Sequence, residues 1–204
     1  MKTLPAFDEL DTIRATIAAM VEADSYTEEE RPRIRRRRLE DTIFELITMG
    51  YVYGIEVAGL DLETDLPVSA DRMRQVADAP TKGETFRDRM ENHFREYENT
   101  GNAETLIDQL SVIAETETHR AINTGGQDGA DEFVTAHPNS NVYKTWLTAG
   151  DERVRDSHDY LEGARVPYDA RFYTYDGDSA RFPGDFVLPQ NNVNCRCILR
   201  YSQE

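Results

Sequence analysis

The sequence predicts an α+β fold, with a helical amino-terminal arm followed by a carboxyl-terminal domain of helices and a small, mainly antiparallel sheet. Through most of the first 124 residues, apolar side chains recur every three or four positions, which is the period of a helix. From residue 125 onward, short runs such as VYKTWLT, RFYTYD and CRCILRY alternate with glycine, proline, asparagine and aspartate. That texture is typical of strands and loops.

Residues 1–64 are predicted to form the arm, as an antiparallel pair of helices. The residues from Thr27 to Glu30 fit a capping box, and Pro32 then falls in the first turn of the second helix, where proline is tolerated. The second helix is expected to run to the region of Gly50 or Gly54.

Residues 65–204 are predicted to form the second domain. Ser69 can cap a short helix, and TKGETFRDRMENHFREYE gives another. The segment NAETLIDQLSVIAETETHRAINTG gives a long helix that is expected to stop at Gly125 and Gly126. Trp146, the only tryptophan, lies in a strand-like run and is expected in the core.

The chain is strongly acidic, with 39 acidic residues against 23 basic ones, of which only three are lysines. A net acidic surface argues against general affinity for nucleic acid, because neutralising phosphates requires a basic face. An acid-rich, lysine-poor composition favours adaptation to high salt, where a short Debye length screens the repulsion between carboxylates. An acidic protein from a GC-rich genome is the alternative.

The sequence predicts no membrane contact. It has no stretch of about 18 apolar residues, and acidic residues interrupt the amino-terminal region where a signal peptide needs a continuous apolar segment. We therefore expect a soluble chain without a cleaved signal.

Six arginines stand within eight residues at the start of the second predicted helix. They are Arg31, Arg33, Arg35, Arg36, Arg37 and Arg38. Arginine binds phosphate and carboxylate groups through two parallel hydrogen bonds, so the cluster is a candidate contact for a polyanion or an acidic partner. The alternative is a solvated helix face balanced by neighbouring glutamates and aspartates.

The only two cysteines, Cys195 and Cys197, lie near the end of the sequence. If they belong to a strand, both point to the same face, because side chains alternate with a period of two. Two thiols on one face form half of a metal site, whereas a disulfide between them would close a small and strained ring. The alternative is that both are small buried apolar groups.

The second part of the sequence contains three motifs in this order: IAETETHRAINTG (113–125), YKTWLTAGDERVRDSHDYLEGARVPYDARF (143–172) and PGDFVLPQNNVNCRC (183–197). Their order and spacing resemble the phage Mu F-like head morphogenesis family, the minor head proteins of tailed viruses. The motif residues singled out here are Glu117, Trp146, Arg155, His158, Asn194, Cys195 and Cys197. Glu115 departs from the pattern, which has a basic residue there.

The resemblance implies a virion protein in the interior of the head near the portal, present in the host cytoplasm during assembly. The implied partners are the portal protein, the major capsid protein or both. The arginine cluster from Arg31 to Arg38 would then be a candidate contact for packaged DNA or for an acidic partner surface. The composition adds the expectation of a halophilic host.

The resemblance also pairs His158 with Cys195 and Cys197 as candidate ligands of a structural zinc ion. A closed structural zinc site has four ligands. The candidates for the fourth are His137, Asp156 and Asp159, whereas His93 and His119 are expected to be exposed on helices.

An enzymatic alternative uses the same three residues. It is a zinc-dependent hydrolase or nuclease in which His158, Cys195 and Cys197 hold the metal and Glu117 or Asp156 is the general base. The sequence contains neither an H-E-x-x-H motif nor a G-x-S-x-G elbow. We therefore predict a structural protein without catalytic residues.

Overall fold

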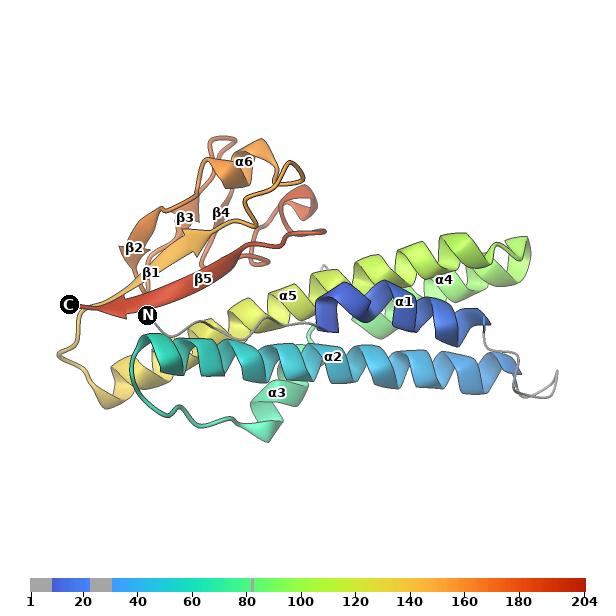
Figure 1. Ribbon diagram of the computed structural model, residues 1–204, viewed down its shortest axis with the longest axis horizontal. Coiled ribbons are helices and arrows are strands. Elements are labelled where there is room, and N and C mark those ends of the chain that lie inside the picture. Colours follow the sequence, from blue (N-terminus) through green and yellow to red (C-terminus); the bar gives the residue numbers. More distant parts are fainter. Residues whose placement is uncertain (1–8, 23–30, 82) are drawn as a thin grey trace.

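The computed structural model describes residues 9–22, 31–81 and 83–204. Five helices come first along the chain, and the strands follow (Figure 1). The helices are α1 (Glu9–Glu22), α2 (Arg31–Asp61), α3 (Ala70–Ala77), α4 (Phe86–Thr100) and α5 (Ala103–Ala136). The capping box predicted at Thr27–Glu30 lies outside the described residues.

The strands form two small antiparallel sheets that lie along one side of α5 (Figure 1). The larger has the order β2-β1-β5 and the smaller pairs β3 with β4. The strands are β1 (Val142–Leu147), β2 (Arg165–Pro167), β3 (Phe172–Tyr173), β4 (Ser179–Ala180) and β5 (Ile198–Gln203). A short helix, α6 (Asp156–Asp159), precedes β2, and a 3₁₀ turn, η1 (Pro189–Asn191), precedes β5. The predicted α+β class is confirmed.

Helix caps follow from local side chains. Ser69 accepts a hydrogen bond from the backbone N–H of Arg72 at the start of α3, as predicted. Thr85 and Asp88 form a capping box at the start of α4, and Asn102 caps α5. These caps satisfy backbone N–H groups that a helix leaves without partners in its first turn.

Glycines lie where the backbones of α2 and α5 contact each other, and neither helix ends at them. A Cβ atom on Gly54 would overlap the carbonyl oxygen of Ile122, and one on Gly125 would overlap that of Tyr51. The two backbones therefore approach more closely than alanine would allow, as in small-residue helix contacts. The predicted helix ends at these glycines are wrong, because tertiary packing outweighs the modest helix propensity cost of glycine, about 1 kcal/mol each.

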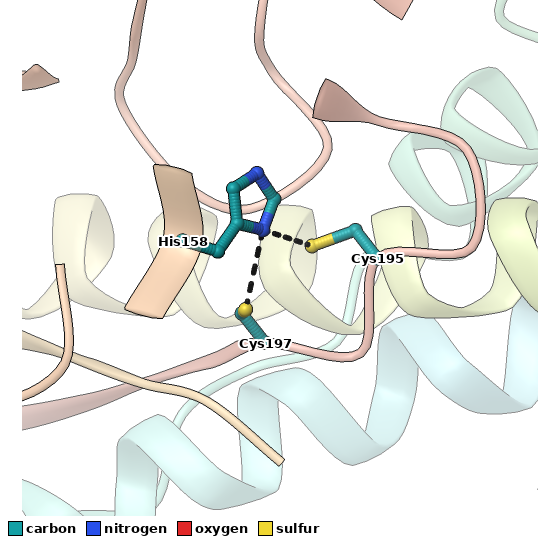
Figure 2. A group of neighbouring side chains, drawn as sticks. All are labelled: His158, Cys195 and Cys197. Carbon is teal, nitrogen blue, oxygen red and sulfur yellow. Dashed lines mark hydrogen bonds between the residues drawn. The ribbon is translucent and has the colours of Figure 1, made fainter. Parts of the chain in front are cut away.

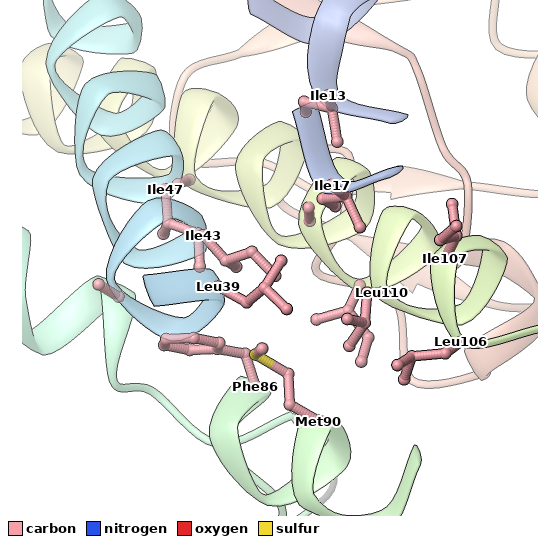
Figure 3. Packing of buried hydrophobic residues seen from close by; sticks show 14 of the residues in the cluster. Ile13, Ile17, Leu39, Ile43, Ile47, Phe86, Met90, Leu106, Ile107 and Leu110 are labelled. Carbon is pink, nitrogen blue, oxygen red and sulfur yellow. The ribbon is translucent and has the colours of Figure 1, made fainter. Parts of the chain in front are cut away.

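The first hydrophobic core fills the space between α1, α2, α4 and α5 (Figure 3). Ile17 of α1, Ile43 of α2, Met90 of α4 and Leu110 of α5 are each fully buried in it. The core thus takes residues from both sides of the boundary predicted between residues 64 and 65. Helix α1 runs beside α2 in the opposite direction (Figure 1).

A second core lies under the sheets and against the end of α5. It contains apolar residues of α2 and α5 together with Val142, Trp146, Phe172 and Leu199. Asp61, the last residue of α2, fastens β5 to the helices: it accepts hydrogen bonds from the Arg200 guanidinium and from the Tyr201 backbone N–H. Its side chain is only 6% exposed.

By length and composition alone, one described helix could cross a membrane. It is the stretch Arg33–Asp61 of α2, with a mean hydropathy of 1.4 in its most apolar window. Of that window, 56% is buried inside the molecule. A core helix of a soluble protein passes the same test, so this finding is weak evidence for a membrane span.

Candidate metal centre

One histidine and two cysteines meet in the second core. His158 lies on α6, and Cys195 and Cys197 lie in the segment just before β5 (Figure 2). The Nδ1 atom of His158 is 3.5 Å from the sulfur of Cys195 and 3.4 Å from that of Cys197. All three side chains are buried, with exposed fractions of 1 to 4%. The structure therefore brings together the three residues that the sequence proposed as ligands.

The two cysteines lie just outside the strand in which the sequence argument placed them. Strand β5 begins at Ile198, so both lie in the preceding loop. This loop turns at Asn194, which has a positive φ of 55° and whose backbone N–H donates to the Thr116 hydroxyl of α5. Buried and less buried side chains alternate from Cys195 through β5, so both sulfurs face inward toward His158 although the loop is not paired as a strand.

Asn123 of α5 holds the end of this loop. Its amide nitrogen donates to the carbonyl oxygen of Cys197 at 3.0 Å, and its amide oxygen accepts from the backbone N–H of Leu199 at 3.1 Å. The residue is 2% exposed. Sequence reasoning missed Asn123, because its neighbours one helical turn away, His119, Arg120 and Gln127, are polar as well and do not mark it as buried.

Aromatic rings fix the orientation of the imidazole. Phe186 stacks on the His158 ring with centroids 5.2 Å apart, and Trp146 meets the same ring edge-on at 5.5 Å. Phe172 packs against Trp146 from another side. The prediction that Trp146 belongs to the core is confirmed, since its side chain is fully buried. These contacts leave His158 little freedom to rotate away from the sulfurs.

The electrostatics favour one thiolate in the cluster. Hydrogen bonding to Cys197 lowers the pKa of Cys195, against the effect of burial, and the hydrogen bond to His158 lowers it further. The hydrogen bond with Cys195, burial and the negative charge on Cys195 raise the pKa of Cys197. The pair therefore shares a proton between two sulfurs beside one imidazole nitrogen.

None of the three predicted fourth ligands joins this cluster. Among the described residues, only His158, Cys195 and Cys197 form a group of His, Cys, Asp or Glu side chains with mutually close donor atoms. His137 is exposed and stacks on Phe133 at the end of α5. Asp156 and Asp159 are exposed as well, because they lie on the outer side of α6.

A small cavity of about 10 Å³ adjoins the cluster. The three cluster residues contribute to its wall, as do three arginines: Arg153, Arg155 and Arg196. Neither Glu117 nor Asp156, the general bases of the enzymatic alternative, lines this cavity. The arrangement places positive charge beside the sulfurs, and no carboxylate from the described part of the chain joins their cluster.

The arginines around the cavity have structural partners. Arg155 donates to the carbonyl oxygen of Val193 at 2.6 Å, and Arg196 forms two hydrogen bonds to the carboxylate of Asp151. The hydrogen bonds from Arg196 lower the pKa of Asp151 to about 2. Arg153 is 78% exposed near the same carboxylate, so this is a surface network.

Two ionisable residues of α5 beside this loop, His119 and Glu115, are half-buried, whereas the sequence predicted an exposed His119. His119 is half-buried, and burial lowers its pKa, so its neutral form is favoured. Glu115, which stands where the resemblance has a basic residue, is also half-buried: burial raises its pKa, while Arg153 and Arg196 oppose this. The acidic replacement therefore lies close to two compensating cations.

Glu117 has a structural position. It is 1% exposed and accepts hydrogen bonds from Arg89 of α4 at 2.6 Å and from Arg120 of α5 at 2.7 Å. Arg120 also donates to the carbonyl oxygen of Val76 on α3. Burial alone would raise the pKa of Glu117, but the two guanidinium groups outweigh it and lower that pKa. Glu117 thus joins three helices.

Lys144 is a buried cation that sequence reasoning missed. It lies on the inner face of β1, and its Nζ donates to Gln127 of α5 at 3.1 Å. Burial, reinforced by Arg181, lowers its pKa to about 8. Its place in the alternating pattern of VYKTWL, two residues before Trp146, was the available signal.

The arginine cluster at the start of α2 contains both side chains that pair within the fold and side chains that are exposed to solvent. Arg36 is part of the fold, because it pairs with Glu40 and Glu91 and lies over the ring of Phe94. Arg37 is 84% exposed, at 4.0 Å from Asp41, and Arg33 is exposed too. Arg35 and Arg38 have further interactions within the structure, and the side chain of Arg31 lies outside its description.

The protein is an α+β domain in which two long helices pack closely at glycines and two small sheets pack against these helices. The motif residues, including the buried His-Cys-Cys cluster, make contacts that hold this fold together. The chain matches the family described as phage Mu protein F like protein over residues 73–200. It belongs to this family, as the resemblance of its motifs predicted.

Two curated relatives match part of the chain. The minor head protein GP7 of Bacillus phage SPP1 is 33% identical over 90 residues, which are 44% of this chain and 28% of that protein. The NAD(+)--arginine ADP-ribosyltransferase EFV of Enterococcus faecalis (strain ATCC 700802 / V583) is 36% identical over 94 residues, 46% of this chain and 19% of that protein. The chain therefore spans less than a third of either relative. No solved structure matches it.

Proposed function

We propose that the protein is a minor structural component of a tailed virus head, located inside the capsid beside the portal, where it assists head assembly or the packaging and delivery of the genome. Family membership over residues 73–200 carries the proposal. The similarity to a protein named as a minor head protein supports it. The named transferase activity belongs to a relative of which the match covers 19%, so it is not transferred here.

The positions of the motif residues agree with a structural role. Glu117 joins α5 to α4 through Arg89, Arg155 holds the carbonyl of Val193, and Asn194 makes the turn before the cysteines. Each of these contacts connects segments that are distant in sequence. Such contacts fix the shape of the domain, which is what an assembly protein presents to its partners.

The partner contact is proposed at the beginning of α2. Arg33 and Arg37 are exposed there, and their guanidinium groups suit an acidic surface of the portal or major capsid protein, or the phosphates of packaged DNA. We propose that residues 1–64 carry this contact and that residues 65–204 form the head morphogenesis domain, although the two segments share one core.

Incorporation into virus heads tests this proposal. Wild-type protein should sediment with purified heads, and the double variant Arg33→Gln/Arg37→Gln should be incorporated less while keeping its helical circular dichroism. The matched control is Arg74→Gln/Arg153→Gln, which removes the same charge from two other exposed arginines. Absence of the wild-type protein from heads would refute the head assignment. Equal incorporation of both double variants would refute the contact at α2.

We also propose adaptation to a halophilic host, because 39 acidic residues stand against 23 basic ones. Screening of exposed carboxylates by molar salt should stabilise the folded chain. The thermal midpoint of unfolding should therefore rise from dilute buffer to molar potassium chloride. A midpoint that does not change with salt would contradict this adaptation.

A further inference from the structure

The distances in the His-Cys-Cys cluster are those of ligands around one metal ion. A tetrahedral zinc ion, with bonds of about 2.3 Å to sulfur and about 2.0 Å to nitrogen, separates these two kinds of ligand atom by about 3.5 Å. The separations between Nδ1 of His158 and the sulfurs of Cys195 and Cys197 are 3.5 and 3.4 Å. Both nitrogen-to-sulfur separations thus match tetrahedral spacing, and all three ligand atoms lie within 4.8 Å of one another.

Two sulfurs compete for one ring nitrogen in this cluster. The Nδ1 atom of His158 has either one lone pair or one proton, so it can make one good hydrogen bond, yet two sulfurs face it (Figure 2). The side chains of Cys195 and Cys197 are buried, so bulk water cannot complete their hydrogen bonding. A cation bound by both thiolates and by the imidazole lone pair satisfies all three at once.

We propose that the chain binds one zinc ion through Nδ1 of His158 and the thiolates of Cys195 and Cys197, with a solvent molecule as the fourth ligand. The ion would connect α6 to the loop before β5. This goes beyond the proposed role in the virus head, because the zinc site is a property of the isolated chain. Soft thiolate ligands with an imidazole select zinc over magnesium or calcium.

The adjoining cavity fits the fourth ligand. Its volume of about 10 Å³ is close to what one water molecule requires, and His158, Cys195 and Cys197 all contribute to its wall. The described residues offer no further His, Cys, Asp or Glu within the cluster, so this part of the chain supplies three ligands. Arg155 and Arg196 in the same wall favour a fourth ligand that is polar and electron-rich.

Charge and connectivity explain what the ion contributes. Zinc with two thiolates and a neutral imidazole has no net charge, so burying the complex costs less than burying a free thiolate. Between β4 and β5 the chain has only the 3₁₀ turn η1 as regular structure. The ion would restrain this segment directly, and the free energy of metal binding would then be part of the free energy of folding.

Metal content and a cobalt spectrum test the site. The reduced full chain, prepared without chelator, should contain about one zinc per molecule by elemental analysis. Replacement of zinc by Co²⁺ should give thiolate-to-cobalt charge-transfer bands and the intense visible absorption of a tetrahedral ion. Folded, reduced wild-type protein that holds no zinc and gives no such bands with added Co²⁺ would overturn the proposal without any variant.

Variants assign the ligands. His158→Asn and Cys197→Ser should each lose most of the bound zinc, whereas His137→Gln and Asp159→Asn, which change two exposed polar residues, should keep about one ion per chain. Zinc retained in folded His158→Asn would overturn the ligand set, and so would zinc lost in the two control variants. If the ligand variants fail to fold, the wild-type cobalt spectrum still decides.

The fourth position has its own test. Azide added to the cobalt form should shift the visible bands, because a small anion can replace solvent beside Arg155 and Arg196. An unchanged spectrum at high azide concentration would overturn the solvent position. Since all these measurements use purified protein, a negative result here leaves incorporation into heads as an independent question.

Discussion

The helical region and the sheet region of this protein are held together in different ways. From α1 to α5, apolar side chains form a continuous core along the helices, and the glycines bring α2 and α5 into backbone contact. The strands are short: β3 and β4 have two residues each, and β2 has three. The sheet region has its own apolar core, but a few buried polar anchors also attach it to the helices, including Asp61, Asn123 and the His-Cys-Cys cluster.

This difference indicates where substitutions should have large effects. In the helical region many contacts share the stabilisation, so only a change that separates the backbones should be severe. In the sheet region, one polar group often satisfies two or three buried partners, so removing it leaves several groups unpaired. The three predictions below examine this contrast, beginning with the largest effect.

Gly54→Ala should destabilise the protein most. A Cβ at this position meets the backbone of Ile122, which cannot move aside as a side chain can. We expect a loss of more than about 3 kcal/mol in the free energy of unfolding, or failure to fold. The measurement is denaturant unfolding followed by circular dichroism.

Gly50→Ala is the matched control for Gly54→Ala. It lies one turn earlier on the same helix, and its Cβ would meet the methyl group and the carbonyl oxygen of Thr118 at 3.0 Å, whereas a Cβ on Gly54 would overlap the carbonyl oxygen of Ile122. Both substitutions gain the same helix propensity of about 1 kcal/mol, so the difference between them reports the backbone contact. Equal unfolding free energies in the two variants would contradict the close approach of α2 and α5.

Asp61→Asn should have the next largest effect, because the carboxylate accepts from both Arg200 and Tyr201. We expect a loss of about 2–3 kcal/mol, since the hydrogen bonds involve a charged group and its side chain is 6% exposed. Glu204→Gln, which breaks an exposed ion pair with Arg165, is the control and should cost less than about 1 kcal/mol. Similar losses in both would show that Asp61 is not an anchor.

Glu117→Gln should have a smaller effect that depends on pH. The pKa of Glu117 is lowered in the folded chain by Arg120 and Arg89, against the effect of burial. Its stabilisation is therefore fully present above its ordinary value of 4.5 and is lost as the pH falls through the lower, folded value. At neutral pH we expect the variant to lose about 1–2 kcal/mol.

Acid unfolding of the two proteins checks this prediction. The difference in unfolding free energy between wild type and Glu117→Gln should shrink as the pH falls below 4.5. A difference that stays constant from neutral to acidic pH would show that the charge of Glu117 does not stabilise the helices.

Much of this architecture could be predicted from local sequence. The helical period, the cap at Ser69 and the strand around Trp146 all depend on neighbours in the chain, and each is confirmed. The motifs also identified the family and the three residues of the cluster. The helical period, the cap and the strand could be predicted because their physical cause lies within a few residues, whereas the cluster was indicated by the resemblance of the motifs.

The contacts between segments that are distant in sequence were decided only by the tertiary structure. Gly54 and Gly125 look like helix ends in the sequence, yet they continue two helices because each helix lies against the other's backbone. The loop that holds the two cysteines beside His158 turns at Asn194 and is fixed by contacts with Thr116 and Asn123, which lie about 70 to 80 residues away along the chain. A local pattern records the propensity of a residue, but the partner that overrides that propensity is fixed only when the chain folds.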